Sequence, residues 1–231
     1  MDPLILVDQA EAQGKIPRPI ARKVRLRMTF LVGAVKRVEK ASGLSYPPYY
    51  VEPVLPVQRS HVEYGQMGVL FARVIPATVT GKLTILMQFT APLVAFGTRS
   101  TIAAVAAHEF AHYVDFVRRL STKDVFAEEG LTTMYESSFA DSDRLVPARL
   151  LFDEKSLVGL VTRKFKNELV DPALNKKVSE SWVGKGLPMR WVSPEENRIS
   201  LGMDVVATAS FDHRVLAKIQ EIQKRMKPRR G

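Results

Sequence analysis

The sequence contains no cysteine, so no disulfide bond stabilises the fold and no thiolate can bind a metal ion. Histidine is also scarce, with four residues in 231, so a metal site would have to combine imidazoles with carboxylates. Long apolar runs are missing: the best candidate, residues 83–96, is interrupted by Gln88, Thr90 and Pro92 and cannot span a bilayer. The apolar stretch at the N-terminus is too short for a secretory signal. We therefore expect a cytoplasmic protein without a transmembrane segment.

Acidic residues are fewer than basic ones, 24 against 34, which gives a net charge of +10. The excess is concentrated in residues 18–40, with eight Lys or Arg and one acid, and in residues 224–231, with five bases and no acid. Residues 109–154 have the opposite balance, with ten acids and five bases. The basic termini could bind a polyanion such as nucleic acid or an anionic surface. A solvated basic helix explains them equally well, because no nucleic-acid-binding motif accompanies them.

Length fits one large domain or a core with a smaller appendage. The composition, with 46% hydrophobic and 25% charged residues, is ordinary for a globular protein. We divide the chain into a flexible leader (1–16), a core (17–145) and a helical C-terminal subdomain (146–231). Helical spacing and capping residues predict helices over 20–41, 100–120, 125–136, 153–169, 177–182 and 212–226. Residues 68–75 and 82–90 are predicted to be antiparallel strands, and the proline-rich residues 46–56 an extended connection.

One of these helices contains the motif His-Glu-x-x-His, at residues 108–112. Positions i and i+4 of a helix lie on the same face, so His108 and His112 can bind one metal ion together. Glu109 lies one step round the helix, where it can take a proton from a water molecule on that metal. The alternative is a pair of surface histidines on an ordinary amphipathic helix. With four histidines in the chain, the motif arises by chance in fewer than about one such chain in a hundred, which favours the metal site.

A catalytic zinc site commonly has three protein ligands and an open position for water. The nearest downstream acids in a predicted helix are Glu128, Glu129 and Glu136. Glu129 and Glu136 are seven residues apart and share a helical face, whereas Glu128 points elsewhere. Asp115, three residues after His112, is placed to accept a hydrogen bond from the second nitrogen of a ligating histidine. Glu136 and Asp141 are the other candidates for that orienting role.

The motif and the segment after it resemble the gluzincins, zinc metallopeptidases with a His-Glu-x-x-His…Glu pattern, and in particular the aminopeptidase-N branch. The resemblance covers about residues 100–141 and rests on two stretches: His108-Glu109-Phe110-Ala111-His112 and Glu129-Gly130-Leu131-Thr132-Thr133-Met134-Tyr135-Glu136. It implies an α+β, zincin-like fold, with a small antiparallel or mixed sheet packed on the motif helix and a largely helical C-terminal part. It also implies Zn²⁺ as cofactor, Glu129 as third ligand and Glu109 as general base in peptide-bond hydrolysis. Glu136 remains the rival third ligand.

Endopeptidase action is favoured over aminopeptidase action. The family's Gly-x-Met-Glu-Asn stretch, which binds the substrate amine, has only residues 65–68, Gly-Gln-Met-Gly, as its counterpart here. No tyrosine follows Tyr135 to stabilise the transition state, so by similarity to thermolysin-like enzymes His213 is the candidate. Other candidates for that role are Arg144, Arg149 and Arg190. The alternative function is a catalytically silent zincin-fold protein that binds nucleic acid or another polyanion through its basic termini. The intact Glu109 favours the enzyme.

Overall fold

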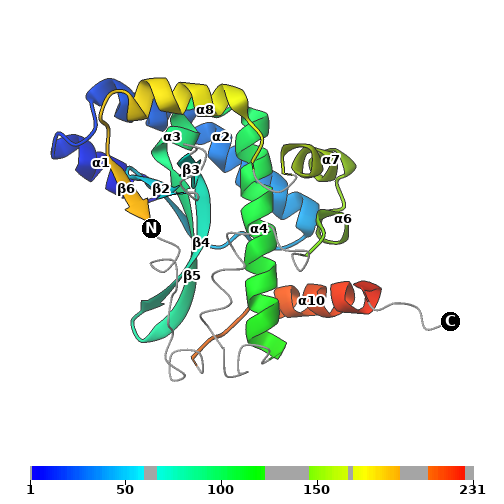
Figure 1. Cartoon of the computed structure of the whole chain (residues 1–231). Coiled ribbons are helices and arrows are strands. Elements are labelled where there is room, and N and C mark those ends of the chain that lie inside the picture. The colour runs from blue at the N-terminus through cyan, green and yellow to red at the C-terminus, as the bar shows by residue number, and fades with distance from the viewer. Residues whose placement is uncertain (1, 60–66, 123–145, 166–168, 193–207, 227–231) are drawn as a thin grey trace.

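The computed structural model describes residues 2–59, 67–122, 146–165, 169–192 and 208–226. It is a mixed α+β structure in which helices surround two small sheets (Figure 1), as the sequence predicts. The helices are α1 (Ile5–Ala12), α2 (Arg18–Ser42), α3 (Ala91–Phe96), α4 (Arg99–Thr122), α6 (Ala148–Leu151), α7 (Lys155–Lys164), α8 (Pro172–Val178), the π-helical turn η2 (Ser179–Val183) and α10 (His213–Met226). The strands are β1 (Tyr49–Glu52), β2 (Leu55–Arg59), β3 (Met67–Val69), β4 (Ala72–Val79), β5 (Lys82–Thr90) and β6 (Met189–Val192).

The larger sheet has the strand order β1-β5-β4. β4 and β5 form an antiparallel hairpin, whose turn places Thr80 and Gly81 at φ angles of 49° and 75°. β1 runs parallel to β5. Along β5, Leu83, Ile85 and Met87 are buried at alternate positions, as expected for a strand that packs one face on the core. The hairpin predicted from residues 68–75 and 82–90 is therefore present, although its first strand begins at Ala72.

The smaller sheet has the order β3-β2-β6. β3 takes residues that the sequence assigned to the hairpin and pairs them with β2 instead. β6, from the C-terminal part of the chain, runs parallel to β2. The segment predicted to be an extended connection, 46–56, is extended, and it supplies β1 and the start of β2.

Residues 5–12 form helix α1, where the sequence predicts a flexible leader. Val7, Ala10 and Ile16 are buried against the core, and the Val51 N–H donates to the Pro3 carbonyl at 2.8 Å. Three buried apolar side chains and this backbone bond hold the segment in place. The apolar pattern of residues 5–12 is too short to be recognised as helical periodicity in the sequence.

The long helix α4 lies against several elements at once, namely α2, α7, α10 and β4. Figure 1 shows α4 running along one side of the larger sheet, with α10 crossing near its C-terminal end. Alanines at five buried positions of α4 allow this close approach: Ala103, Ala104, Ala106, Ala107 and Ala111. Among the described helices, none has the length and apolar character needed to cross a bilayer.

Candidate metal site on helix α4

The structure brings the two motif histidines together on α4. Both are buried, with 7% of His108 and 8% of His112 exposed, and their Nε2 atoms lie 3.0 Å apart. Two nitrogens that each lie 2.0–2.1 Å from one tetrahedral zinc would be about 3.3 Å apart, so this pair is close to the spacing that zinc requires. The predicted convergence of His108 and His112 on one point is present.

The imidazole of His112 is also in a suitable chemical state. Burial, the neighbouring His108 and the charge of Arg119 lower the pKa of His112 to about 3. His112 is therefore neutral at physiological pH, and the neutral imidazole is the form that binds metal. The His108–His112 pair can supply two of the three protein ligands of a catalytic zinc ion.

The ring of Phe165, the first residue after α7, stacks on the ring of His108. Their centroids are 3.8 Å apart and the ring planes differ by 5°. This contact limits rotation of His108 about its side-chain bonds. No sequence signal links Phe165 to the motif, because the two residues are 57 positions apart and meet only through the packing of α7 on α4.

Tyr46 supports the helix beneath the motif. Like Phe165, it has no sequence signal that links it to the motif. Its hydroxyl donates to the Ala106 carbonyl at 2.9 Å, and its ring stacks on Phe110 with centroids 5.2 Å apart. Burial raises the pKa of Tyr46 well above its ordinary value, and the negative charge of Glu109 contributes to the rise. The half-buried Glu109 therefore lies close to this phenol.

Asp115 is buried on α4, but its partners are arginines. One carboxylate oxygen accepts from Arg118 at 2.7 Å, and the other accepts from Arg119 at 2.8 Å. Arginines three and four residues further along a helix are well placed to reach such a carboxylate. The predicted role of Asp115 in orienting a histidine stays a prediction.

His213, the predicted transition-state residue, is the first residue of α10. Its imidazole side chain is 90% exposed, with Nδ1 3.4 Å from a carboxylate oxygen of Asp212. Burial, and then the charge of Asp212, raise the pKa of Tyr113 to about 12, so the start of α10 lies near Tyr113. Tyr113 is one helical turn after Glu109 and shares its face. The structure thus brings α10 to the Glu109 side of α4, while the His213 ring itself faces solvent.

The remaining predicted site residues are only partly covered. Glu129, Glu136 and Arg144 lie outside the described residues. Arg149 is exposed on α6, and Arg190 is exposed on β6. Within the described part of the chain, no third His, Asp or Glu joins the two histidines to complete a metal-binding group.

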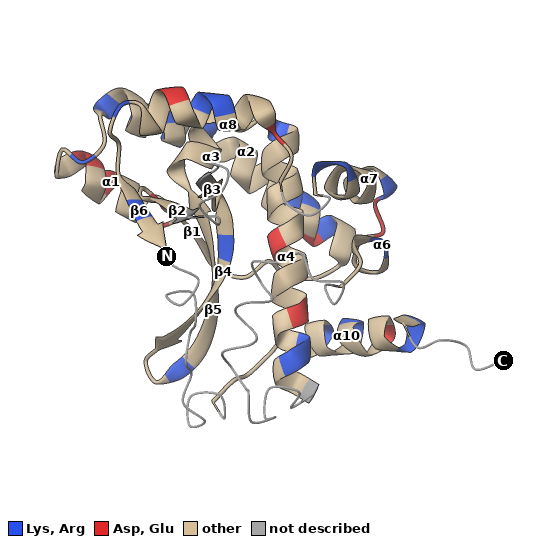
Figure 2. Cartoon of the chain, viewed as in Figure 1, with Lys and Arg blue, Asp and Glu red and all other residues tan. Residues whose placement is uncertain are grey.

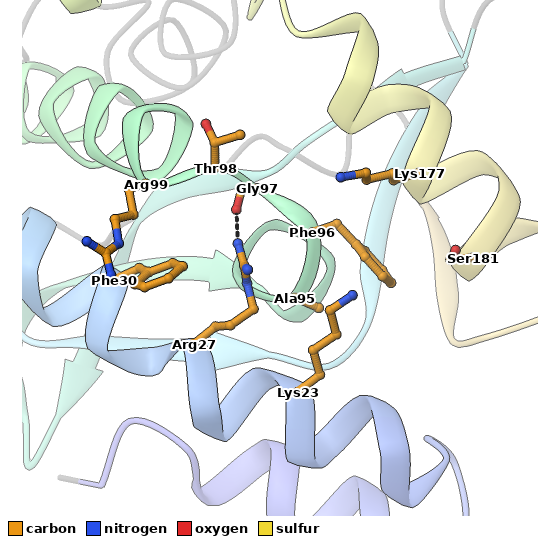
Figure 3. Close-up of a pocket in the computed structure, with 10 residues that line it drawn as sticks. All are labelled: Lys23, Arg27, Phe30, Ala95, Phe96, Gly97, Thr98, Arg99, Lys177 and Ser181. Atoms are coloured by element: carbon orange, nitrogen blue, oxygen red, sulfur yellow. Dashed lines mark hydrogen bonds between the residues drawn. The ribbon is translucent and has the colours of Figure 1, made fainter.

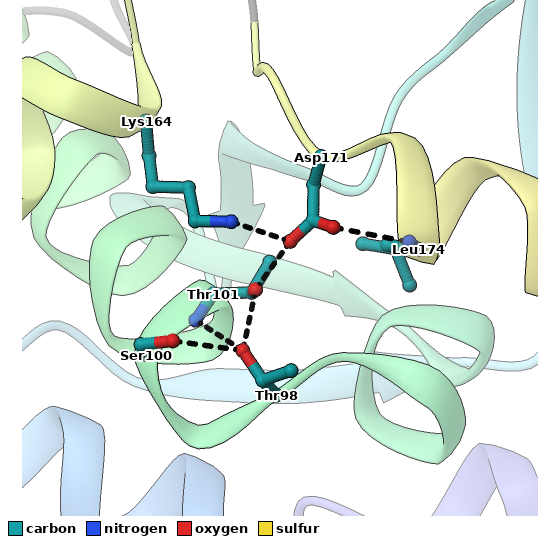
Figure 4. A network of polar contacts seen from close by, with 6 residues as sticks. All are labelled: Thr98, Ser100, Thr101, Lys164, Asp171 and Leu174. Atoms are coloured by element: carbon teal, nitrogen blue, oxygen red, sulfur yellow. Dashed lines mark hydrogen bonds and ion pairs between the residues drawn. The ribbon is translucent and has the colours of Figure 1, made fainter.

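A buried polar network fixes the N-terminal end of α4 (Figure 4). Asp171 is 5% exposed, and one of its oxygens accepts from Lys164 at 2.8 Å and from the Thr101 hydroxyl. The other oxygen accepts from the Leu174 N–H at 3.0 Å and so caps α8. At the same point, Thr98 accepts from the Thr101 N–H at 3.1 Å. The network joins α4, α7 and α8 around one carboxylate.

We expect Asp171→Asn to lower the free energy of unfolding by about 1–3 kcal/mol, because Lys164 loses its buried partner. Burial opposes the charged form of Asp171, but the hydrogen bonds from Lys164, Thr101 and Leu174 outweigh it and lower the pKa. The charge therefore stabilises the fold above the unfolded pKa of about 3.9, and this contribution is lost as the pH falls through the lower folded value.

Urea unfolding of wild type and Asp171→Asn at several pH values measures this difference, which should shrink below about pH 4. The exposed Asp153, which lies outside the network, provides the control Asp153→Asn with the same chemical change. Equal effects of the two substitutions at pH 7 would contradict the role assigned to Asp171.

Comparisons of the chain with protein-family models, with curated proteins and with solved structures find no match.

Proposed function

We propose that this protein is a zinc-dependent endopeptidase. The observation that carries the proposal is the buried pair His108 and His112, whose Nε2 atoms lie 3.0 Å apart on α4, with Glu109 next to them on the same helix. Two buried histidines facing each other are not the surface pair of an ordinary amphipathic helix.

The arrangement around α4 supports the proposal. A zincin-like fold places its motif helix against a small mixed sheet, and here α4 lies along β4 of the β1-β5-β4 sheet, with α2 packed against it. The resemblance of residues 100–141 to the gluzincins points to the same reaction. It also names Glu129 as the third ligand, with Glu136 as its rival.

The residues divide the chemistry between them. His108, His112 and Glu129 would hold the metal. A zinc ion held at this site would act as a Lewis acid: it would polarise the scissile carbonyl and lower the pKa of a bound water towards about 7. Glu109 accepts the proton of the attacking water and passes it to the leaving amine. Phe165 and Tyr46 hold the His108 ring and the helix backbone in position.

Purified wild-type protein is expected to contain close to one zinc per chain and to hydrolyse casein or a quenched fluorescent peptide. Removing zinc with a chelator should abolish hydrolysis, and adding back zinc should restore it, while magnesium should not, because magnesium prefers oxygen ligands to imidazole. Hydrolysis that continues in metal-free protein would refute the proposal.

The alternative is a zincin-fold protein that binds a polyanion without catalysis. The structure weakens one of its premises, because part of the basic segment 18–40 is already neutralised. Arg25 binds Asp8 and Glu11, and Arg37 binds Glu154. Folded, zinc-loaded, full-length protein that cleaves no peptide would favour the alternative.

A further inference from the structure

Four basic side chains line one pocket near the N-terminal end of α4. The pocket has a volume of about 410 Å³, within the range of small-molecule sites. Lys23 and Arg27 come from α2, Arg99 from the first turn of α4 and Lys177 from α8. Figure 3 shows Lys23 from α2 and Lys177 from α8 reaching towards the space beside Phe96, with Arg27 of α2 pointing to the Gly97 carbonyl. None of the described residues that line the pocket is acidic.

Two aromatic rings and the backbone hold three of these cations in position. The guanidinium groups of Arg27 and Arg99 lie over the ring of Phe30, at 4.7 and 4.5 Å from its centre, and the Lys23 ammonium lies 4.5 Å from the centre of Phe96. Arg27 also donates to the Val94 carbonyl at 3.0 Å and to the carbonyl of Gly97. The positive groups of Lys23, Arg27 and Arg99 are therefore held in position before any ligand arrives, which lowers the entropy cost of binding.

The cluster carries uncompensated positive charge. Among the described residues, none of the four cations forms an ion pair with a carboxylate, in contrast to Arg25, Arg37 and Arg118 elsewhere. Burial, and then the charges of Arg27 and Lys177, lower the pKa of Lys23. Burial and the charge of Arg99 likewise lower the pKa of Arg27. A multivalent anion in the pocket would relieve this repulsion.

We propose that this pocket binds a small phosphate-bearing molecule. A phosphomonoester carries a charge of about −1.5 to −2 and three acceptor oxygens, which match several converging cations. Arginine binds phosphate through paired N–H groups, and lysine binds it as a compact charge. An extended nucleic acid needs a track of basic residues along a surface, whereas these four converge on one concavity.

The phosphate site is separate from the metal site. Arg99 and His108 are nine residues apart on α4, or about 14 Å along the helix axis. Figure 2 shows basic residues on α7, α8 and α10 as well, so a general attraction for anions must be distinguished from binding in the pocket. A variant with the same charge change outside the pocket separates the two.

The decisive experiment is calorimetric titration with pyrophosphate at low ionic strength, on metal-free and zinc-loaded protein. We expect a dissociation constant below about 1 mM for wild type, the same with and without zinc. The triple variant Lys23→Gln/Arg99→Gln/Lys177→Gln should bind at least about tenfold more weakly. Arg27 is left unchanged because it also bonds to the carbonyls of Val94 and Gly97.

The control variant is Arg22→Gln/Lys36→Gln/Lys185→Gln, which removes the same charge from exposed positions outside the pocket and should bind like wild type. Circular dichroism checks that each variant is folded. If the pocket triple variant does not fold, Lys177→Gln alone, at an exposed position of α8, should still weaken binding at least about threefold. Inorganic phosphate should bind in the same place but more weakly, because it carries less charge.

Three outcomes would overturn the proposal. Wild-type protein could show no heat of binding with millimolar pyrophosphate. The two triple variants could weaken binding equally, which would mean general surface charge. Finally, a short single-stranded oligonucleotide or anionic lipid vesicles could bind without competition from pyrophosphate, which would assign the positive charge to a larger partner. Because the readout is binding, none of these outcomes depends on whether the protein hydrolyses peptides.

Discussion

Glu109→Gln is expected to retain zinc and the fold while losing peptide hydrolysis by at least about 10²- to 10⁴-fold, the usual contribution of general acid–base catalysis. Glutamine has the same shape as glutamate but cannot accept the proton of the attacking water. In the structure Glu109 is half-buried on α4, beside the two histidines, whose imidazoles would hold the metal. Removing its negative charge should also remove one of the causes that raise the pKa of Tyr46.

The measurement is the rate of quenched-peptide hydrolysis beside zinc content, for wild type and variant prepared in parallel. Glu180→Gln, the same chemical change at an exposed position of η2, is the matched control and should cleave at the wild-type rate. Glu109→Gln that cleaves as fast as wild type would contradict the mechanism. Loss of zinc together with activity would mean that Glu109 is a ligand and not the base.

Elements with an uninterrupted apolar period were predictable from sequence. The motif helix, predicted over 100–120, spans Arg99–Thr122, and the basic helix predicted over 20–41 spans Arg18–Ser42. The final helix was placed within one residue of its observed start at His213. In each case the helical face contains many buried apolar side chains, so local pattern and tertiary packing agree.

The sheets could be predicted only in part, because strand pairing depends on partners distant in the sequence. The alternation of apolar and polar residues identifies the β4–β5 hairpin. Its strands are joined by a two-residue turn. The alternation does not show that Leu55 pairs with Met189, more than 130 residues away. The predicted strand over 68–75 was divided between two sheets for the same reason: the pattern shows extended backbone and not its neighbours.

The candidate site shows the same limit. His108, Glu109 and His112 could be grouped from sequence because one helix carries all three. Phe165 and Tyr46 reach the motif from other elements through packing. The basic pocket was visible only as a charge excess in residues 18–40. Its remaining two cations, Arg99 and Lys177, lie in segments with no unusual composition.

Replacing the third metal ligand should abolish zinc binding and hydrolysis together, in contrast to Glu109→Gln. The resemblance to the gluzincins assigns this ligand to Glu129 and leaves Glu136 as its rival. We therefore expect Glu129→Ala to contain little zinc and to be inactive, because two histidines alone do not complete a catalytic zinc site. Glu136→Ala should keep zinc, with an affinity lowered by at most about 10- to 100-fold if Glu136 supports a ligand from the second coordination sphere.

Zinc content after dialysis against metal-free buffer, measured for wild type, Glu129→Ala, Glu136→Ala and His108→Ala/His112→Ala, separates the assignments. The double histidine variant should contain no zinc, since it lacks the buried pair whose Nε2 atoms lie 3.0 Å apart. The reverse result for the two glutamates, with zinc lost in Glu136→Ala and kept in Glu129→Ala, would transfer the third ligand to Glu136 and leave the hydrolytic mechanism intact. Wild-type zinc levels in the double histidine variant would refute the metal site itself, because neither of the chain's two remaining histidines, His61 and His213, belongs to a His-Glu-x-x-His motif.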